Sequence, residues 1–88
     1  MINLPEHPKL NRLFRLQWEE VQESWVLLYP EGMVKLNGSA GEIMRRLNGE
    51  KSVRTLISDL ETDFGASGLQ ADVLAFLDIA AQQGWVKT

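Results

Sequence analysis

The sequence predicts an α+β domain in which a three-stranded antiparallel sheet is followed by three helices. Apolar and polar residues alternate in two of the segments before residue 38, and after it apolar residues recur at spacings of three and four. The chain has 88 residues, of which 44% are hydrophobic and 24% charged, values typical of one small globular domain. We therefore expect a single domain over residues 13–88. Residues 1–12 carry two prolines and show no periodicity, which predicts a flexible N-terminal segment.

Three strands are expected in the first half of the chain. The stretch LFRLQWEEV begins with the period-two pattern of a half-buried strand. The stretch SWVLLY is apolar on both faces, as a central strand would be, and the sequence YPEG that overlaps its end predicts a tight turn. The third strand, 33–37, places Val34 and Leu36 on one face and Met33 and Lys35 on the other.

Helical patterns follow over residues 39–48, 52–64 and 69–83. Ser39 and Glu42 have the spacing of a capping box, in which each side chain bonds a free amide at the start of the helix. The three helices can cover one face of the sheet. Two short helices, a longer one and a β-hairpin also describe a winged helix-turn-helix arrangement.

Small residues mark the limits of these helices. Ser52 is placed to cap the second helix, and Gly49 to end the first. Gly41 lies inside the first helix, where glycine costs up to about 1 kcal/mol relative to alanine. Either another group packs closely against Gly41, or the helix tolerates it without a structural reason.

The third helix has an apolar surface wider than one core face requires. Its main stripe consists of Leu69, Val73, Phe76, Leu77 and Ala80. Leu74 and Ile79 lie beside this stripe and widen it. The surplus surface indicates contact with something other than the sheet.

The composition excludes several kinds of chemistry. There is no cysteine, and the single histidine, His7, lies in the N-terminal segment, so we expect no catalytic site, metal site or cofactor. The net charge of −3 disfavours nucleic acid and anionic membranes as partners. No apolar run approaches the roughly 18 residues of a membrane span, and no signal peptide is recognisable. The expected protein is a cytoplasmic binding module, not an enzyme.

Two kinds of binding module fit this architecture. A winged helix-turn-helix protein could bind DNA and regulate transcription, but its recognition helix needs basic residues. The second predicted helix is net acidic, and the third has no basic residue. The alternative is a peptide-binding module that adds an extended peptide to an open strand edge beside an apolar groove. The outer strands of the predicted sheet offer such edges, and they also predict a monomer that can self-associate through them.

The stretch LLYPEGMVKLNGSAGEI closely resembles the signature of the PqqD family of pyrroloquinoline quinone (PQQ) biosynthesis, and DVLAFLDIAAQQGWV is also similar to that family. The resemblance covers roughly residues 14–86. It implies a peptide-recognition element of three strands and three helices, of the type that serves ribosomally made, modified peptides. It further implies binding of the precursor peptide PqqA. The partner enzyme would be PqqE, a radical S-adenosylmethionine enzyme that cross-links a glutamate and a tyrosine of PqqA.

The resemblance also implies where the peptide lies. In related recognition elements the peptide adds to the third strand and packs against the third helix. Carried over to this chain, the peptide-binding residues are Met33, Val34, Lys35, Leu36, Asp72, Val73, Phe76 and Leu77. The helical members of this set either face the peptide or belong to the core. Lys35 has a second interpretation too, as a charge that keeps an exposed edge from aggregating.

Overall fold

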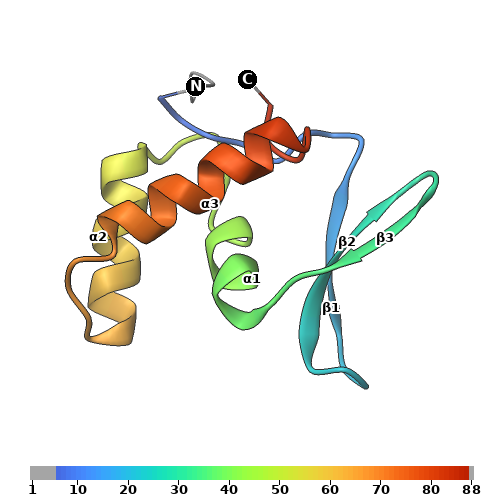
Figure 1. Ribbon diagram of the computed structural model, residues 1–88, viewed down its shortest axis with the longest axis horizontal. Helices are drawn as coiled ribbons and strands as arrows, with labels where there is room; N and C mark the ends of the chain where they lie inside the picture. Colours follow the sequence, from blue (N-terminus) through green and yellow to red (C-terminus); the bar gives the residue numbers. More distant parts are fainter. Residues whose placement is uncertain (1–5, 88) are drawn as a thin grey trace.

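The computed structural model describes residues 6–87 (Figure 1). Over these residues the elements are β1 (Arg15–Glu19), β2 (Ser24–Tyr29), β3 (Gly32–Lys35), α1 (Gly38–Met44), α2 (Val53–Phe64) and α3 (Gln70–Gln82). The strands form one antiparallel sheet in the order β1-β2-β3. The predicted fold class and element order are therefore confirmed.

The sheet has the register that the residue pattern predicts. Tyr29 pairs with Gly32 across the turn, so Pro30 and Glu31 form a two-residue loop between β2 and β3. Trp18 on β1 lies opposite Trp25 on β2, and their rings meet edge to face with centroids 5.4 Å apart. Such aromatic pairs across strands contribute to sheet stability and fix the strand alignment.

Two hydrophobic clusters form the core. The sheet-side cluster packs the inner face of the sheet against α1 and the end of α3, and its buried members are Leu27, Leu36, Ala40, Met44, Ala80 and Val86. The helix-side cluster lies where α1, α2 and α3 meet, and its buried members are Ile43, Leu56, Leu60, Val73 and Leu77. Figure 1 shows α1 between the sheet and α2, so α1 contributes to both clusters.

The start of α1 differs from the predicted capping box. The helix begins at Gly38, and the N-cap is Asn37, whose Oδ1 accepts hydrogen bonds from the Ala40 amide (2.8 Å) and the Ser39 hydroxyl (3.1 Å). Asparagine is as good an N-cap as serine, and the extended backbone of Asn37 at the exit from the sheet gives it that position. Glu42 is consequently free to bond other partners.

The end of α1 also differs from the prediction of a helix to residue 48. The last regular bond runs from the Arg45 amide to the Gly41 carbonyl (3.0 Å). The next amides, of Arg46 and Leu47, bond carbonyls three residues back, which tightens and ends the helix. The second helix matches its prediction more closely, since the Ser52 side chain accepts from the Thr55 amide.

Part of the N-terminal segment is hydrogen bonded into the fold. The Gly49 amide donates to the Pro8 carbonyl, the Lys87 amide to the Lys9 carbonyl, and the Asn11 amide to the Trp85 carbonyl, at 2.8–3.1 Å. Residues 8–11 thus tie the α1–α2 loop to the C-terminal extended piece. Flexibility remains a prediction for residues 1–5, which lie outside the described residues.

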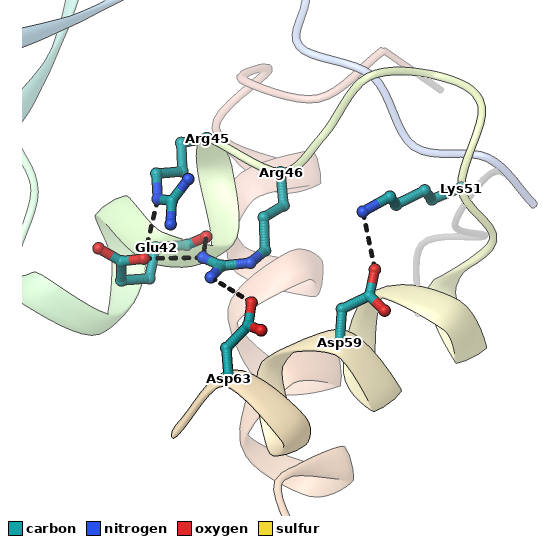
Figure 2. A network of polar contacts seen from close by, with 6 residues as sticks. All are labelled: Glu42, Arg45, Arg46, Lys51, Asp59 and Asp63. Atoms are coloured by element: carbon teal, nitrogen blue, oxygen red, sulfur yellow. Dashed lines mark hydrogen bonds and ion pairs between the residues drawn. The ribbon is translucent and has the colours of Figure 1, made fainter. Parts of the chain in front are cut away.

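A cluster of charged side chains joins α1 to α2 (Figure 2). Glu42 Oε1 accepts from Arg45 Nε (2.8 Å) and Arg46 Nη1 (2.7 Å), while Arg46 Nη2 donates to Asp63 Oδ2 (2.8 Å). The Arg46 side chain is only 9% exposed. The hydrogen bond from Arg46 lowers the pKa of Glu42, assisted by Arg45 and opposed by burial. Burial opposes the charge of Arg46, but its bonds to Glu42 and Asp63 prevail and raise its pKa.

Close packing at Gly41 decides between the two interpretations of that residue. A Cβ atom at Gly41 would lie 2.6 Å from Cδ1 and 2.9 Å from Cβ of Trp25. These distances are far below van der Waals contact, so only glycine lets α1 approach β2 this closely. The conformational cost of the glycine is offset by burial of the indole against the helix.

We expect Gly41→Ala to lower the melting temperature, although alanine is the better helix former. The added methyl group must displace Trp25 or α1. Overpacking costs about 1–3 kcal/mol, and the contact at 2.6 Å to the indole of Trp25 puts this site in the upper part of that range, above the roughly 1 kcal/mol gained in helix propensity. Gly38→Ala is the matched control, because a Cβ there has nothing within 4 Å. A Gly41→Ala variant more stable than the wild type in thermal unfolding would contradict this account.

We expect Glu42→Gln to lower the free energy of unfolding at neutral pH by about 1 kcal/mol, because a neutral amide accepts more weakly from the two arginines. The pKa of Glu42 is depressed below its ordinary value of 4.5 in the folded state. Its contribution is therefore complete above that value and is lost as the pH falls through the folded pKa. The difference between Glu42→Gln and the wild type should shrink in acid. A difference that stays constant from neutral to acid pH would disprove the linkage.

Candidate functional site

β3 is an outer strand of the sheet. Within the described residues no strand pairs with the backbone groups on its outer edge. The Leu36 amide donates to the Trp25 carbonyl at 3.0 Å, so Leu36 faces β2 with its backbone groups. In an antiparallel pair these inward residues alternate with outward ones. The amides and carbonyls of Met33 and Lys35 therefore point away from the sheet.

The side chains of β3 and of Leu36, which follows it directly, divide between the two faces as the sequence predicts. Leu36 is buried in the sheet-side cluster, and Val34 is half-buried beside it. Met33 and Lys35 are exposed on the opposite face. An extended chain added to this edge would place alternate side chains beside Val34 and Leu36, on the helical side of the sheet.

A groove of about 760 Å³ lies on that helical side, between β3 and α3. Its volume is within the range of ligand sites in proteins. The strand side is lined by Val34, Lys35 and Leu36. The main side chains of the remaining lining are Ala40, Glu42, Ile43, Leu60, Phe64, Leu69, Asp72, Val73, Phe76, Ile79 and Trp85. Most of the lining is apolar, and Glu42 and Asp72 are charged. Lys35 borders the groove although its side chain lies on the outer face of the sheet.

The structure brings most of the predicted site residues to this groove. The residues that line it are Val34, Lys35, Leu36, Asp72, Val73 and Phe76. Met33 lies on the outer face of the sheet with 52% of its surface exposed, and only its backbone groups reach the edge. Leu77 is fully buried in the helix-side cluster and is a core residue.

Two of the helical residues for which peptide contact and core were both open, Val73 and Phe76, differ in their placement. Val73 is buried in the helix-side cluster but also forms part of the groove floor. Phe76 is half-buried, packs against both core clusters and lies at the groove surface. Each therefore serves packing and groove together, so the two alternatives are not exclusive.

Several large apolar residues of the groove were not predicted as site residues, among them Phe64, Ile79 and Trp85. Phe64 and Ile79 are 55% and 52% exposed, and Trp85 packs against Phe76 with ring centroids 6.4 Å apart. Ile79 was detectable, because it lies outside the main stripe of α3. Phe64 continues the regular apolar face of α2 and Trp85 has the character of a core residue, so nothing in their spacing separates them from core residues.

The groove offers shape and backbone hydrogen bonds but little reactive chemistry. Within residues 6–87 no group of three or more His, Cys, Asp or Glu side chains could hold a metal ion. None of the helices in this part of the chain is long and apolar enough to cross a lipid bilayer. An apolar floor beside a free strand edge suits an extended peptide better than a small polar ligand.

Comparison with known proteins identifies relatives that extend over nearly the whole chain. A protein of Stutzerimonas stutzeri named PqqA binding protein is 41% identical over 87 residues, which covers 98% of this chain and 95% of the relative. A protein of the same name from Azotobacter vinelandii is 45% identical over 85 residues, covering 96% and 92%.

A solved structure has the same fold. It is the solution NMR structure of the PqqD part of PqqCD from Methylobacterium extorquens, described as a functional, stand-alone recognition element for ribosomally synthesised and post-translationally modified peptides. The TM-score is 0.79 at 27% identity, covering 98% of this chain and 96% of the other. The family model for coenzyme PQQ synthesis protein D (PqqD) matches residues 24–86. With this match and relatives above 40% identity, the chain belongs to the PqqD family.

Proposed function

We propose that this protein binds the precursor peptide PqqA in PQQ biosynthesis and presents it to the radical S-adenosylmethionine enzyme PqqE. The relatives named PqqA binding protein support the choice of peptide. The observation that carries the mechanism is the free edge of β3, whose Met33 and Lys35 backbone groups point outward beside the apolar groove. PqqA adds to this edge as a fourth strand.

Successive side chains of the added peptide strand point to opposite faces of the sheet, and the two sets have different roles. Peptide residues opposite Val34 and Leu36 turn their side chains into the groove towards Phe76, where apolar side chains are favoured. Residues opposite Met33 and Lys35 accept and donate the backbone hydrogen bonds and keep their side chains on the outer face. Backbone pairing supplies affinity for any extended chain, and the groove selects the sequence.

The rigidity of β3 reduces the entropic cost of binding. One end of the strand is fixed by the two-residue turn at Pro30 and Glu31, and the other by the Asn37 cap of α1. A strand that is already ordered loses little conformational entropy when a partner pairs with it. Most of the ordering cost then falls on the peptide.

The short strand supports presentation of the peptide to PqqE through what it leaves free. Under this proposal the chemistry belongs to PqqE, and the protein holds the peptide. A peptide held by a short strand keeps the rest of its length accessible, so that PqqE can reach residues outside the groove. The protein thus raises the local concentration of PqqA at the enzyme without taking part in the chemistry.

We expect Lys35→Pro to keep the fold and to weaken PqqA binding at least tenfold, about 1.4 kcal/mol. The Lys35 amide faces outward, so proline there breaks no bond to β2, but it removes a donor to the peptide and places a ring against it. Binding would be measured by titrating labelled protein with synthetic PqqA and following amide NMR signals, and folding by the melting temperature. Met33→Pro should behave in the same way.

Two controls separate the loss of the backbone donor from the loss of the lysine charge and from a loss of stability. Lys35→Ala removes the charge but keeps the amide donor, so it should bind PqqA much better than Lys35→Pro. Val34→Pro removes an amide that pairs with β2 and should lower the melting temperature. If Lys35→Pro and Met33→Pro both fold and bind PqqA as the wild type does, the peptide is not added to β3.

We also expect a monomer that self-associates only at high concentration, because β1 and β3 are the outer strands of the sheet over the described residues. If association uses the β3 edge, PqqA should suppress it by occupying the same backbone groups. Sedimentation velocity with and without peptide measures this. A tight dimer at nanomolar concentration, unaffected by peptide, would contradict the expectation.

A further inference from the structure

The groove is longer than the strand that forms one of its sides. β3 spans four residues, Gly32–Lys35, which is roughly 13 Å at 3.3 Å per residue. At Asn37 the chain leaves the sheet and enters α1. The groove continues along α1 and α3 to the α2–α3 loop, where its lining includes Leu69. A peptide paired with β3 therefore has groove beyond the last residue that it can pair with.

The part of this groove beyond β3 has its own lining, and we call this part the compartment. We define it by Ile43, Leu60, Phe64, Ala66, Leu69 and Val73, which come from all three helices and the α2–α3 loop. Its floor belongs to the helix-side cluster, whereas the part beside β3 rests on the sheet-side cluster. Phe76 packs against both clusters and lies at the boundary.

Phe64 is an exposed apolar residue that is held in place. It is 55% exposed at the last position of α2. The Arg46 guanidinium lies 5.6 Å from the centre of its ring, within the range of a cation–π contact. Arg46 is itself fixed by Glu42 and Asp63 (Figure 2). An aromatic side chain held at the mouth of an apolar compartment loses little entropy when a ligand covers it.

We propose that this compartment is a second subsite, which takes an apolar side chain of PqqA from outside the residues paired with β3. The proposal rests on the proposed function, since it assumes that PqqA lies along the same continuous groove. The side chain is aliphatic or aromatic, because all six defining residues are apolar. Backbone pairing at β3 then sets the register of the peptide, and the compartment reads a residue at a fixed distance along it.

The test is PqqA binding by Phe64→Ala, measured beside Lys35→Pro. Removing an aromatic contact at an interface should weaken binding roughly tenfold, with little change in melting temperature because Phe64 is more than half exposed. Phe64→Leu should restore most of the affinity, since it keeps an apolar side chain. Leu13→Ala is the control, because Leu13 is 66% exposed and lies outside the groove lining.

A second variant and an NMR measurement of contacts in the complex keep the test valid even if Phe64→Ala is destabilised. Ala66→Glu puts a charge into the compartment from an exposed loop position, where the fold should tolerate it, and it should also weaken binding. In the complex, nuclear Overhauser contacts should connect Phe64 ring protons with a peptide side chain that does not pair with β3.

The outcomes separate this proposal from the proposed function. If Phe64→Ala and Ala66→Glu bind PqqA normally while Lys35→Pro does not, the second subsite is wrong and strand addition stands. If only the compartment variants lose binding, the compartment binds PqqA, but strand addition and the register that it would set are wrong. If Phe64, Ala66 and Lys35 variants all bind normally, PqqA does not use this groove and both are wrong.

Discussion

The pairing of Leu36 with Trp25 is the interaction on which the other features of the site depend. The hydrogen bond from the Leu36 amide to the Trp25 carbonyl fixes the end of β3 at the point where the chain turns into α1. Because side chains alternate along a strand, a slip of one residue would turn Val34 and Leu36 outward and bury Lys35. The same slip would exchange the inward and outward amides. Register, groove lining and free edge are thus set together.

Trp25 connects this pairing to the helices. Its backbone holds Leu36, and its side chain fits against Gly41 in the middle of α1. The contact sets how closely α1 approaches the sheet, and α1 in turn carries Glu42, which pairs with Arg46 and through it with α2. One side of the groove is therefore positioned by a chain of contacts that starts in the sheet. Its other side, α3, is held by Phe76 and by the two core clusters that Phe76 joins.

The sequence predicts the local features of this fold better than the contacts between distant segments. Alternation identified the faces of β3, and the apolar stripe identified α3, because these patterns depend only on neighbouring residues. The cap of α1 was assigned to Ser39 because Ser39 and Asn37 both satisfy the local rule, and only the path of the chain from β3 decides between them. The bonds of residues 8–11 and the exposure of Phe64 follow from packing between segments far apart in the sequence. No spacing rule contains that information.

Lys35 shows how one residue can serve both as protection of an edge and as part of a binding site. Its side chain lies on the outer face, while its amide points along the sheet plane towards an incoming strand. If a second copy paired antiparallel with β3 about Lys35, the two lysine side chains would meet on the same face and repel each other. A peptide with a neutral or acidic residue at that position would meet no such penalty. The charge therefore disfavours pairing between copies and leaves the backbone groups available to PqqA under the proposed mechanism, so the two interpretations of Lys35 are compatible.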